Sequence, residues 1–337
     1  MLINSFFSIS IIILTLVNIF IFINIDKLNN LINIYDNPNQ KRKIHQKKIS
    51  KTGGWIIFFN LSVIYLIYFL IPQNDISLIY SNTNYISFYL GCFLFFLLGL
   101  IDDIYDLKPN IKLLSALLIV ILILNFDNNL VISDLKFSFV DNKISTSSFG
   151  VVFTTFCILL FINAFNMFDG INLQSILYSV ILILGNLVFS NSLNFIIFLF
   201  PLIFVLIILN YKNKIFLGDN GSLLLGFIFS YLFIFNYNKS FIFDADIIFI
   251  FMMLPGLELL RLAITRISKK RNPFSADNLH IHHLLLRKYS YRTTLFSNLT
   301  LIIIPILIVS YTDLNSLYII SLFIIFYIAL ILKLTRY

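Results

Sequence analysis

The sequence predicts an all-α polytopic membrane protein with about eleven transmembrane helices, folded as a single domain over residues 1–337. Composition is the first reason, because 59% of the residues are hydrophobic and only 12% are charged, about half the charged fraction of a soluble domain. Apolar runs of roughly 17–25 residues, each long enough to cross a bilayer, recur along the chain. Lysine and arginine are concentrated in alternate polar segments, as in membrane proteins of fixed orientation.

Hydropathy places the predicted spans along the whole chain. The first, residues 4–25, lacks a preceding basic region and a small-residue cleavage site, so we expect it to remain as an uncleaved span. The others are residues 55–72, 85–101, 111–126, 150–165, 173–190, 193–210, 221–236, 246–265, 293–312 and 316–333.

The distribution of positive charge predicts the orientation. Most lysines and arginines lie in segments that would share one face, whereas the opposite face would hold only Lys136, Lys143 and Lys239. The richly basic face is therefore expected in the cytoplasm, with the N-terminus outside and the C-terminus inside. This placement explains the net charge of +8 without a nucleic-acid partner. Cys92 and Cys157 both lie in apolar runs, so the sequence predicts neither a disulfide nor a cysteine metal site.

Four polar clusters fall on the same predicted face. They are "DDIYD" (102–106), "NAFNMFDGIN" (163–172), "FLGDNGS" (216–222) and "HIHH" (280–283). Polar and charged groups near membrane depth are costly and are usually functional. We therefore expect one active site built from cytoplasmic loops at residues 26–54, 102–112, 163–174, 210–222 and 266–292.

The first cluster brings acids together at the end of a span. Asp102 and Asp106 are four residues apart, so they can share a helix face. Adjacent carboxylates repel unless a cation or proton lies among them, and Lys112 follows one turn into the next span. A solvated helix end is the alternative interpretation.

The second cluster interrupts an apolar stretch with Asn163, Asn166, Asp169 and Asn172 at every third position. These side chains would form a slowly rotating stripe on a helix that ends near Asp169-Gly170. The alternative is hydrogen bonding between membrane helices.

In the third cluster, Gly218 and Gly221 flank Asp219, and Ser222 is a candidate cap for the following helix. A helix N-terminus favours phosphate, and a carboxylate suits an accompanying Mg²⁺ ion. A plain turn is the alternative.

The fourth cluster holds His280, His282 and His283 near Arg271. A zinc site would need a further ligand, so phosphate binding fits the basic surroundings better; contact with anionic lipid is the alternative. The basic segment 35–54, with His45 and Gly53-Gly54, is explained largely as a positive-inside loop.

In this order, "DNPNQKRKIH…GG", "GLIDD", "NAFNMFDG", "FLGDNGSLLLG" and "HIHH" resemble the polyprenyl-phosphate N-acetylhexosamine-1-phosphate transferases. This membrane family, glycosyltransferase family 4, includes the WecA, TagO and MraY enzymes. The resemblance covers residues 35–288, and "HIHH" is similar to the WecA-type pattern.

The resemblance implies a bacterial inner-membrane enzyme whose active site faces the cytoplasm. It would transfer a sugar-1-phosphate, by default N-acetylglucosamine-1-phosphate, from a UDP-sugar to undecaprenyl phosphate, releasing UMP. Mg²⁺ would be the cofactor, with Mn²⁺ a possible substitute, and the protein could be a homodimer.

The family pattern also implies roles for individual residues. Asp219 would bind Mg²⁺ with Asp169, while Asp102, beside Asp103, would deprotonate or orient the lipid phosphate. Phe216 would stack on uracil. The catalytic group would also include His280, His282 and His283, which with Lys112 would bind the diphosphate or the sugar. The other predicted substrate contacts are Asn163, Asn166, Asn172, Asn210, Arg271 and His45.

The chain departs from the family pattern in three places. Where the family has Asp-Gly-x-Asp-Gly-Leu, this chain has Asn172 and Leu173 in place of the second Asp-Gly, followed by Gln174. Glu258-Leu259 replaces an Asp-Thr pair, and Ser50-Lys51 replaces Pro-Arg. We interpret the first change as altered sugar preference. An inactive relative and a multi-span lipid or glycan transporter are the alternatives.

Overall fold

The structure is a computed structural model, and it describes residues 2–38, 47–70, 82–189, 193–240, 244–273, 275 and 277–335. A helix occupies every segment that was predicted to span the membrane. These helices are α1 (Leu2–Ile23), α3 (Gly53–Leu70), α4 (Asn82–Tyr105), α5 (Pro109–Phe126), α6 (Gly150–Phe168), α7 (Gln174–Phe189), α8 (Leu193–Tyr211), α9 (Gly218–Ser240), α10 (Ala245–Ser268), α12 (Tyr291–Tyr311) and α13 (Ser316–Thr335).

Length and hydropathy separate these helices into two groups. In the described part of the chain, seven are long and apolar enough to cross a membrane, and an eighth candidate is α1 joined to α2 (Ile25–Ile32) through a bend of 74°. Three others are shorter apolar helices, at Gly53–Ile67, Gln174–Phe189 and Phe198–Tyr211. The prediction of a helical polytopic membrane protein is confirmed at this coarser level.

Helix α9 forms the centre of the bundle and packs against α3, α4 and α6. In α9, 89% of the apolar stretch that could cross the membrane is buried inside the protein, whereas in the peripheral helix α13 the buried share is 17%. Large aromatic side chains fill the contacts around it: Phe227 of α9 stacks on Phe88 and Phe95 of α4, and Tyr231 of α9 meets Phe88 edge to face. The peripheral helices instead expose Leu, Ile and Phe side chains, as expected for surfaces facing hydrocarbon.

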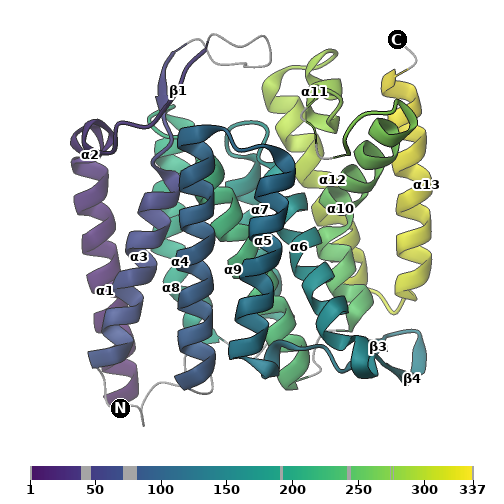
Figure 1. Cartoon of the computed structure of the whole chain (residues 1–337), viewed down its shortest axis with the longest axis horizontal. Helices are drawn as coiled ribbons and strands as arrows, with labels where there is room; N and C mark the ends of the chain where they lie inside the picture. The colour runs from purple at the N-terminus through teal and green to yellow at the C-terminus, as the bar shows by residue number, and fades with distance from the viewer. Residues whose placement is uncertain are drawn as a thin grey trace.

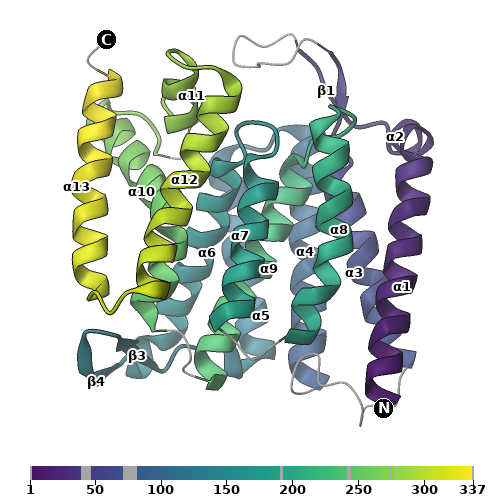
Figure 2. The ribbon, with the colours of Figure 1, turned by 180° about the vertical axis from the view of Figure 1, so that it is seen from behind.

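The two ends of the bundle differ in the elements that cover them (Figures 1 and 2). One end carries α2, the C-terminus, the short helix α11 (Ile281–Leu286), and β1 (Tyr35–Asp36) paired antiparallel with β2 (Ile49–Ser50); we call this the α11 end. The other end, the hairpin end, carries the N-terminus and the antiparallel strands β3 (Asp134–Phe137) and β4 (Val140–Ser145). Single-turn 3-10 helices, Asn128–Leu130 and Ser147–Phe149, flank this hairpin. The sequence predicted none of these strands.

A buried polar cluster near the hairpin end ties three helices together. The Asp127 carboxylate, 2% exposed, accepts hydrogen bonds from Asn84 Nδ2 at 2.6 Å and Ser87 Oγ at 2.9 Å. Tyr231 Oη adds a bond of 3.2 Å to the same carboxylate. Because each buried polar group finds partners, we interpret this cluster as structural.

Candidate active site

An acid cluster bridged by a lysine lies where α4, α5 and α9 meet at the α11 end. Lys112 Nζ is 2.6 Å from Asp102 Oδ2 and 2.6 Å from Asp219 Oδ1. Asp102 is the last buried residue of α4, and its other oxygen accepts the Leu107 N–H at 2.9 Å. The Asp219 side chain remains 32% exposed. The chain thus holds two carboxylates around one ammonium group at a position that is open to solvent, confirming that these three residues are brought together.

Helix α6 contributes Asn166 to the same cluster. Asn166 Nδ2 donates to Asp219 Oδ1 at 2.7 Å and to Ser222 Oγ at 2.6 Å. Asn166 lies in the last turn of α6, and Asp219 lies in the first turn of α9. The close packing of these two helices therefore places an amide beside the carboxylate, as expected for the second and third sequence clusters.

Asp103 has a different position from its neighbour Asp102. Its carboxylate accepts the backbone N–H groups of Asp219 at 3.1 Å and Asn220 at 2.9 Å, so it caps the N-terminus of α9. Lys51 Nζ contacts the same carboxylate at 2.9 Å, and the Asp103 side chain is 0% exposed. A carboxylate in this position is stabilised by the helix dipole. The expectation that Ser222 caps this helix is wrong, because α9 begins at Gly218, one turn earlier.

Close packing around the start of α9 explains two glycine positions. Gly218 has a φ of 74°, and a Cβ there would lie 2.8 Å from Asp103 Oδ2. A Cβ on Gly54 would lie 1.9 Å from Asn220 Oδ1. Glycine at both positions lets α9 and α3 approach closely. The Gly53-Gly54 pair at the end of the basic segment therefore contributes to helix packing.

Asp169 lies just beyond the end of α6 and is held by Ser175 Oγ, which donates to its Oδ1. Burial raises the pKa of Asp169 to about 7, and the nearby charges of Asp219 and Asp103 act in the same direction. An added Cβ on Gly170 would lie 2.0 Å from His282 Nε2. The turn after α6 therefore connects the acid cluster to the histidine segment.

The three histidines of the "HIHH" segment form one compact group. The ring centroids of His280 and His282 are 5.2 Å apart, those of His282 and His283 are 4.4 Å apart, and those of His280 and His283 are 6.1 Å apart. Burial lowers the pKa of His280 to about 4 and lowers that of His282 well below its usual value. Both imidazoles are therefore neutral near pH 7, when they can both donate and accept hydrogen bonds.

The loop before these histidines is fixed by Asp277. Arg266 Nε contacts Asp277 Oδ2 at 2.7 Å, and the Leu279 N–H donates to Asp277 Oδ1 at 2.9 Å. Burial opposes ionisation of Asp277, but these hydrogen bonds hold its pKa below the usual value. Asp277, the acidic residue nearest to the histidines in the sequence, is thus paired with Arg266.

The unusual "NLQ" ending of the second cluster forms a turn fastened on several sides. Asn172 Nδ2 donates to Asn213 Oδ1 at 2.5 Å, while Tyr291 Oη donates to the Asn172 carbonyl at 2.5 Å. Leu173 has a φ of 65°, a conformation that glycine adopts without steric cost. Gln174, 0% exposed, donates to the Phe168 carbonyl at 2.6 Å and accepts from Asn298 at 2.8 Å.

Several residues predicted to bind substrate have other partners. Asn163 Nδ2 donates to the Leu159 carbonyl of its own helix, and buried Asn210 bonds the Leu173 N–H and the Ile215 carbonyl. Asn172 bonds Asn213 rather than the acid cluster. Arg271 is exposed, and His45 lies outside the described residues. Phe216 is partly buried, and its backbone N–H donates to the Ser50 carbonyl at 2.7 Å. Their substrate roles stay predictions.

Sequence reasoning missed four residues that support the site. Lys51 pairs with Asp103, Ser175 bonds Asp169, and Asn220 Nδ2 donates to the Lys51 carbonyl at 3.1 Å. Glu258 accepts the Ile281 N–H at 2.8 Å. Lys51 and Glu258 were noticed only as departures from the family pattern. That was a usable signal, although it did not reveal their partners.

The acid cluster offers oxygen donors of the kind that Mg²⁺ prefers. Among the described residues, no three histidine, cysteine, aspartate or glutamate side chains converge as a metal site. Mg²⁺, however, is commonly bound through one or two carboxylates together with substrate phosphates and water. Asp102 and Asp219 already share a cation, the Lys112 ammonium, through hard oxygen donors. The residues therefore fit an ion completed by a substrate diphosphate.

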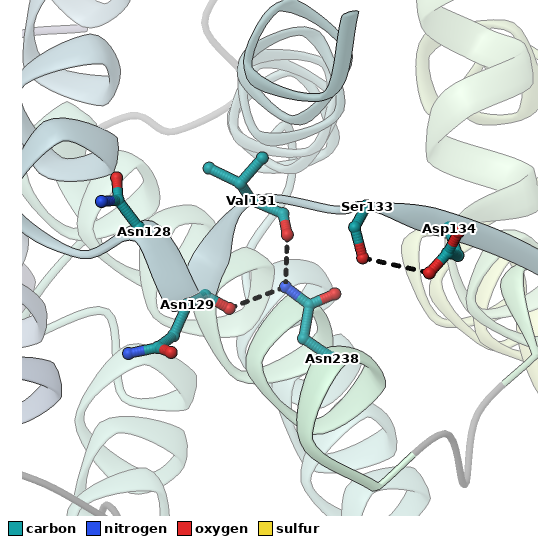
Figure 3. A pocket seen from close by; sticks show the side chains of 6 residues that line it. All are labelled: Asn128, Asn129, Val131, Ser133, Asp134 and Asn238. Atoms are coloured by element: carbon teal, nitrogen blue, oxygen red, sulfur yellow. Dashed lines mark hydrogen bonds between the residues drawn. The ribbon is translucent and has the colours of Figure 1, made fainter. Parts of the chain in front are cut away.

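A hollow of about 400 Å³ lies at the hairpin end (Figure 3). Its polar groups are largely bonded to one another: Asn238 Nδ2 donates to the carbonyls of Asn129 and Val131, and Ser133 Oγ donates to Asp134. It is lined by Asn128, Asn129, Val131, Ser133, Asp134 and Asn238. Lysine and arginine are missing from this lining, so the hollow is a poorer match for anionic substrates than the acid cluster with its neighbouring lysines.

Comparison with known proteins adds an independent line of evidence. Residues 85–237 match the model of glycosyl transferase family 4. An undecaprenyl-phosphate alpha-N-acetylglucosaminyl 1-phosphate transferase of Escherichia coli strain K12 is 26% identical over 293 residues, covering 81% of this chain and 76% of the relative. Proteins of the same name from Yersinia pestis and Thermotoga maritima are 28% and 29% identical, over 76% and 77% of this chain and 70% and 75% of theirs.

The family match spans α4 to α9, the helices that carry Asp102, Asn166 and Asp219. The similarity to the three relatives extends over most of the chain at modest identity. Over residues 85–237 the chain is thus similar to glycosyl transferase family 4, and over most of its length it is similar to relatives named as undecaprenyl-phosphate alpha-N-acetylglucosaminyl 1-phosphate transferases.

Proposed function

We propose that this protein transfers a sugar-1-phosphate from a UDP-sugar to undecaprenyl phosphate, giving undecaprenyl-diphosphate-sugar and UMP. The relatives are named as undecaprenyl-phosphate alpha-N-acetylglucosaminyl 1-phosphate transferases, so N-acetylglucosamine-1-phosphate is the first group to test. The reaction would be the first membrane step in the assembly of a cell-envelope glycan.

The observation that carries this proposal is the cluster of Asp102, Lys112, Asp219 and Asn166 at the start of α9, with the histidine segment at the same end. Both substrates are anionic, and one phosphate must approach another. Lysine, a divalent ion and a helix N-terminus all favour bound phosphate. The Asp219 side chain is 32% exposed, so the cluster can be reached from the solvent.

The reaction needs one bond made and one broken. An oxygen of the lipid phosphate would attack the sugar-bearing phosphorus of the UDP-sugar, and the bond from that phosphorus to the bridging oxygen would break, releasing UMP. A phosphate monoester loses its second proton near pH 6, so most of the acceptor already carries two negative charges at neutral pH. Asp102 Oδ2 already contacts the Lys112 ammonium at 2.6 Å, so Asp102 would orient the acceptor together with Lys112, and an acceptor that is already ionised needs no base.

The other residues would position the donor. Asn166 keeps the Asp219 carboxylate in place through a bond of 2.7 Å. The neutral imidazoles of His280 and His282, together with His283, would donate to the diphosphate or the sugar. Mg²⁺ bound through Asp219, with Asp169 nearby, would neutralise charge on the diphosphate and the departing UMP. Mn²⁺ has compatible oxygen-ligand chemistry and could substitute.

We further propose eleven membrane spans, with the α11 end in the cytoplasm of a bacterial inner membrane. Seven long helices, the bent α1–α2 pair and the three shorter apolar helices would together give these eleven spans. Basic residues on the α11 side support this orientation. A homodimer is a further proposal that follows only from the family resemblance.

The acid cluster argues against the transporter alternative. Asp102 lies in the last turn of α4 and Asp219 in the first turn of α9. Transporter sites typically lie near the middle of the bilayer, at interrupted helices, whereas these acids are found at helix ends.

The proposal can be tested with purified protein, undecaprenyl phosphate, Mg²⁺ and a panel of UDP-N-acetylhexosamines. Release of UMP that requires both the lipid and Mg²⁺ is the expected result with at least one sugar. An absence of UMP release with every sugar would contradict the transferase function. Asn172→Asp tests specificity: unchanged relative rates across the panel would contradict a role for Asn172 in sugar preference.

A further inference from the structure

An ion pair on α10 holds the backbone on both sides of His280. Glu258 and Arg261 lie one helical turn apart, and Arg261 Nη2 is 2.9 Å from Glu258 Oε2. Glu258 Oε2 accepts the Ile281 N–H at 2.8 Å, while Arg261 Nη2 donates to the Leu279 carbonyl at 2.7 Å. His280 is thereby bracketed by two hydrogen bonds of opposite polarity, one from each member of the pair.

Helix α13 completes this arrangement. Tyr327 Oη donates to Glu258 Oε1 and accepts from Arg261 Nε at 2.9 Å. Glu258 is 4% exposed and Tyr327 is also 4% exposed. Burial strengthens charge-assisted hydrogen bonds and makes an unpaired partner costly, so the pair has one favourable geometry.

The Glu258–Arg261 pair is connected to the acid cluster through His282. Ile281 is 1% exposed and His282 is 2% exposed, and His282 packs against Gly170, next to Asp169. Glu258, His280 and His282 also lie around the same narrow gap as Phe168 at the end of α6. A shift of the Leu279–Ile281 backbone would therefore move the imidazoles relative to Asp169.

We infer that Glu258 and Arg261, with Tyr327, are positioning residues that fix the histidine segment for binding of the donor diphosphate. They contact no reacting atom in this account and act through the backbone around His280. The identity of the substrate in this inference rests on the proposed function, whereas the two hydrogen bonds to the backbone around His280 are features of the fold itself. It also gives Glu258, a departure from the family's aspartate, a structural purpose in this chain.

A double variant separates positioning from stability. Glu258→Leu or Arg261→Met alone leaves a buried charge without its partner, so each should lower the melting temperature of the protein in detergent. Glu258→Leu/Arg261→Met replaces the pair with apolar side chains, which often restores stability. The double variant should therefore recover most of the lost melting temperature, yet it still lacks both hydrogen bonds to the segment.

Two readouts then report on the segment. Hydrogen–deuterium exchange followed by mass spectrometry should show faster exchange in peptides covering residues 278–286 of the double variant. In kinetics with UDP-N-acetylglucosamine as the probe, KM for the donor should rise about 10–100-fold. The turnover number should change much less, because binding lost equally from the ground and transition states raises KM alone.

A pair at the opposite end of α10 provides the matched control. Lys136 Nζ is 3.2 Å from Asp244 Oδ1 near the hairpin end, and Lys136→Met/Asp244→Leu removes it in the same way. This control should leave both KM and the exchange of residues 278–286 unchanged. Equal effects in the two double variants would show a general response to charge removal and would overturn the inference.

The possible failures are distinguishable. If the wild-type protein transfers no sugar-phosphate, the proposed function fails, and the substrate part of the inference fails with it. The exchange measurement then still decides whether the pair orders the segment. If the wild type is active and the Glu258→Leu/Arg261→Met variant keeps a native KM and native exchange, the positioning role is wrong while the proposed function stands.

Discussion

At the residue scale, the charge balance of the acid cluster depends on Lys112. Its ammonium contacts Asp102 and Asp219 at 2.6 Å each, with the lysine side chain 18% exposed. Two carboxylates held this close repel each other when no cation separates them. Lys112 therefore stabilises the arrangement that would receive the substrates.

The Lys112→Gln variant tests this role. Removing one partner of a buried ion pair costs about 3–5 kcal/mol; partial exposure of these groups should reduce that to about 2 kcal/mol. We expect a lower melting temperature in EDTA and a partial recovery when Mg²⁺ is added, because a divalent cation can replace the ammonium between the carboxylates. A melting temperature that is unaffected by the substitution would show that Lys112 does not hold the cluster together.

His280 gives a prediction for pH. Burial lowers its pKa from 6.5 to about 4, so between those values the unfolded chain binds a proton that the folded chain does not. The free energy of unfolding contributed by His280 must therefore fall as the pH falls from 6.5 toward 4. Asp169 acts in the opposite direction, because its pKa is raised to about 7 in the folded protein.

The comparison with His280→Gln isolates the histidine from this opposing effect. Melting temperatures measured from pH 7.5 to pH 4 should fall more steeply for the wild type than for the variant. Parallel curves for the two proteins would show that His280 keeps an ordinary pKa in the folded state.

At the scale of elements, the turn between α6 and α7 is fixed by Gln174 rather than by the asparagine that precedes it. Gln174 connects the end of α6 to α12 through the Phe168 carbonyl and Asn298. Asn172 instead contacts Asn213 near the surface. The positive φ of Leu173 retains the backbone path for which the family uses glycine.

Gln174→Ala should lower the free energy of unfolding by about 1–3 kcal/mol, because it leaves buried polar groups without partners. Asn172→Ala is the control, since its amide lies in a more exposed contact, and it should change the melting temperature little. Thermal unfolding in detergent measures both. Equal losses of stability in the two variants would contradict the distinction between them.

At the scale of the whole molecule, hydropathy was sufficient to predict where helices form. All the predicted spans coincide with helices, because long apolar runs must satisfy their backbone hydrogen bonds internally. The ordered motifs predicted that Asp102, Lys112, Asn166 and Asp219 converge. Contacts between distant residues were not predictable: the Lys51–Asp103 pair and the Glu258 bond to Ile281 depend on how helices pack. Hydropathy also missed the β3–β4 hairpin, a short polar element outside the apolar periodicity.

Cysteine labelling tests the proposed orientation of the bundle. In a Cys92→Ala/Cys157→Ala background, Asn142→Cys on the exposed β4 strand and Lys269→Cys beyond α10 present thiols at opposite ends. A membrane-impermeant maleimide should label Asn142→Cys in intact cells whose outer barrier admits the reagent, and Lys269→Cys only after the inner membrane is opened. The reverse pattern would contradict a cytoplasmic α11 end.

The most direct test of the central claim compares Asp219→Asn with the wild type in Mg²⁺-dependent transfer from UDP-N-acetylglucosamine to undecaprenyl phosphate. Asp219 contacts both Lys112 and Asn166, so the neutral amide should reduce turnover by about 100-fold or more. Asp106→Asn, at an exposed position just after α4, should keep nearly full turnover. Full turnover by Asp219→Asn would place the catalytic centre elsewhere in the molecule.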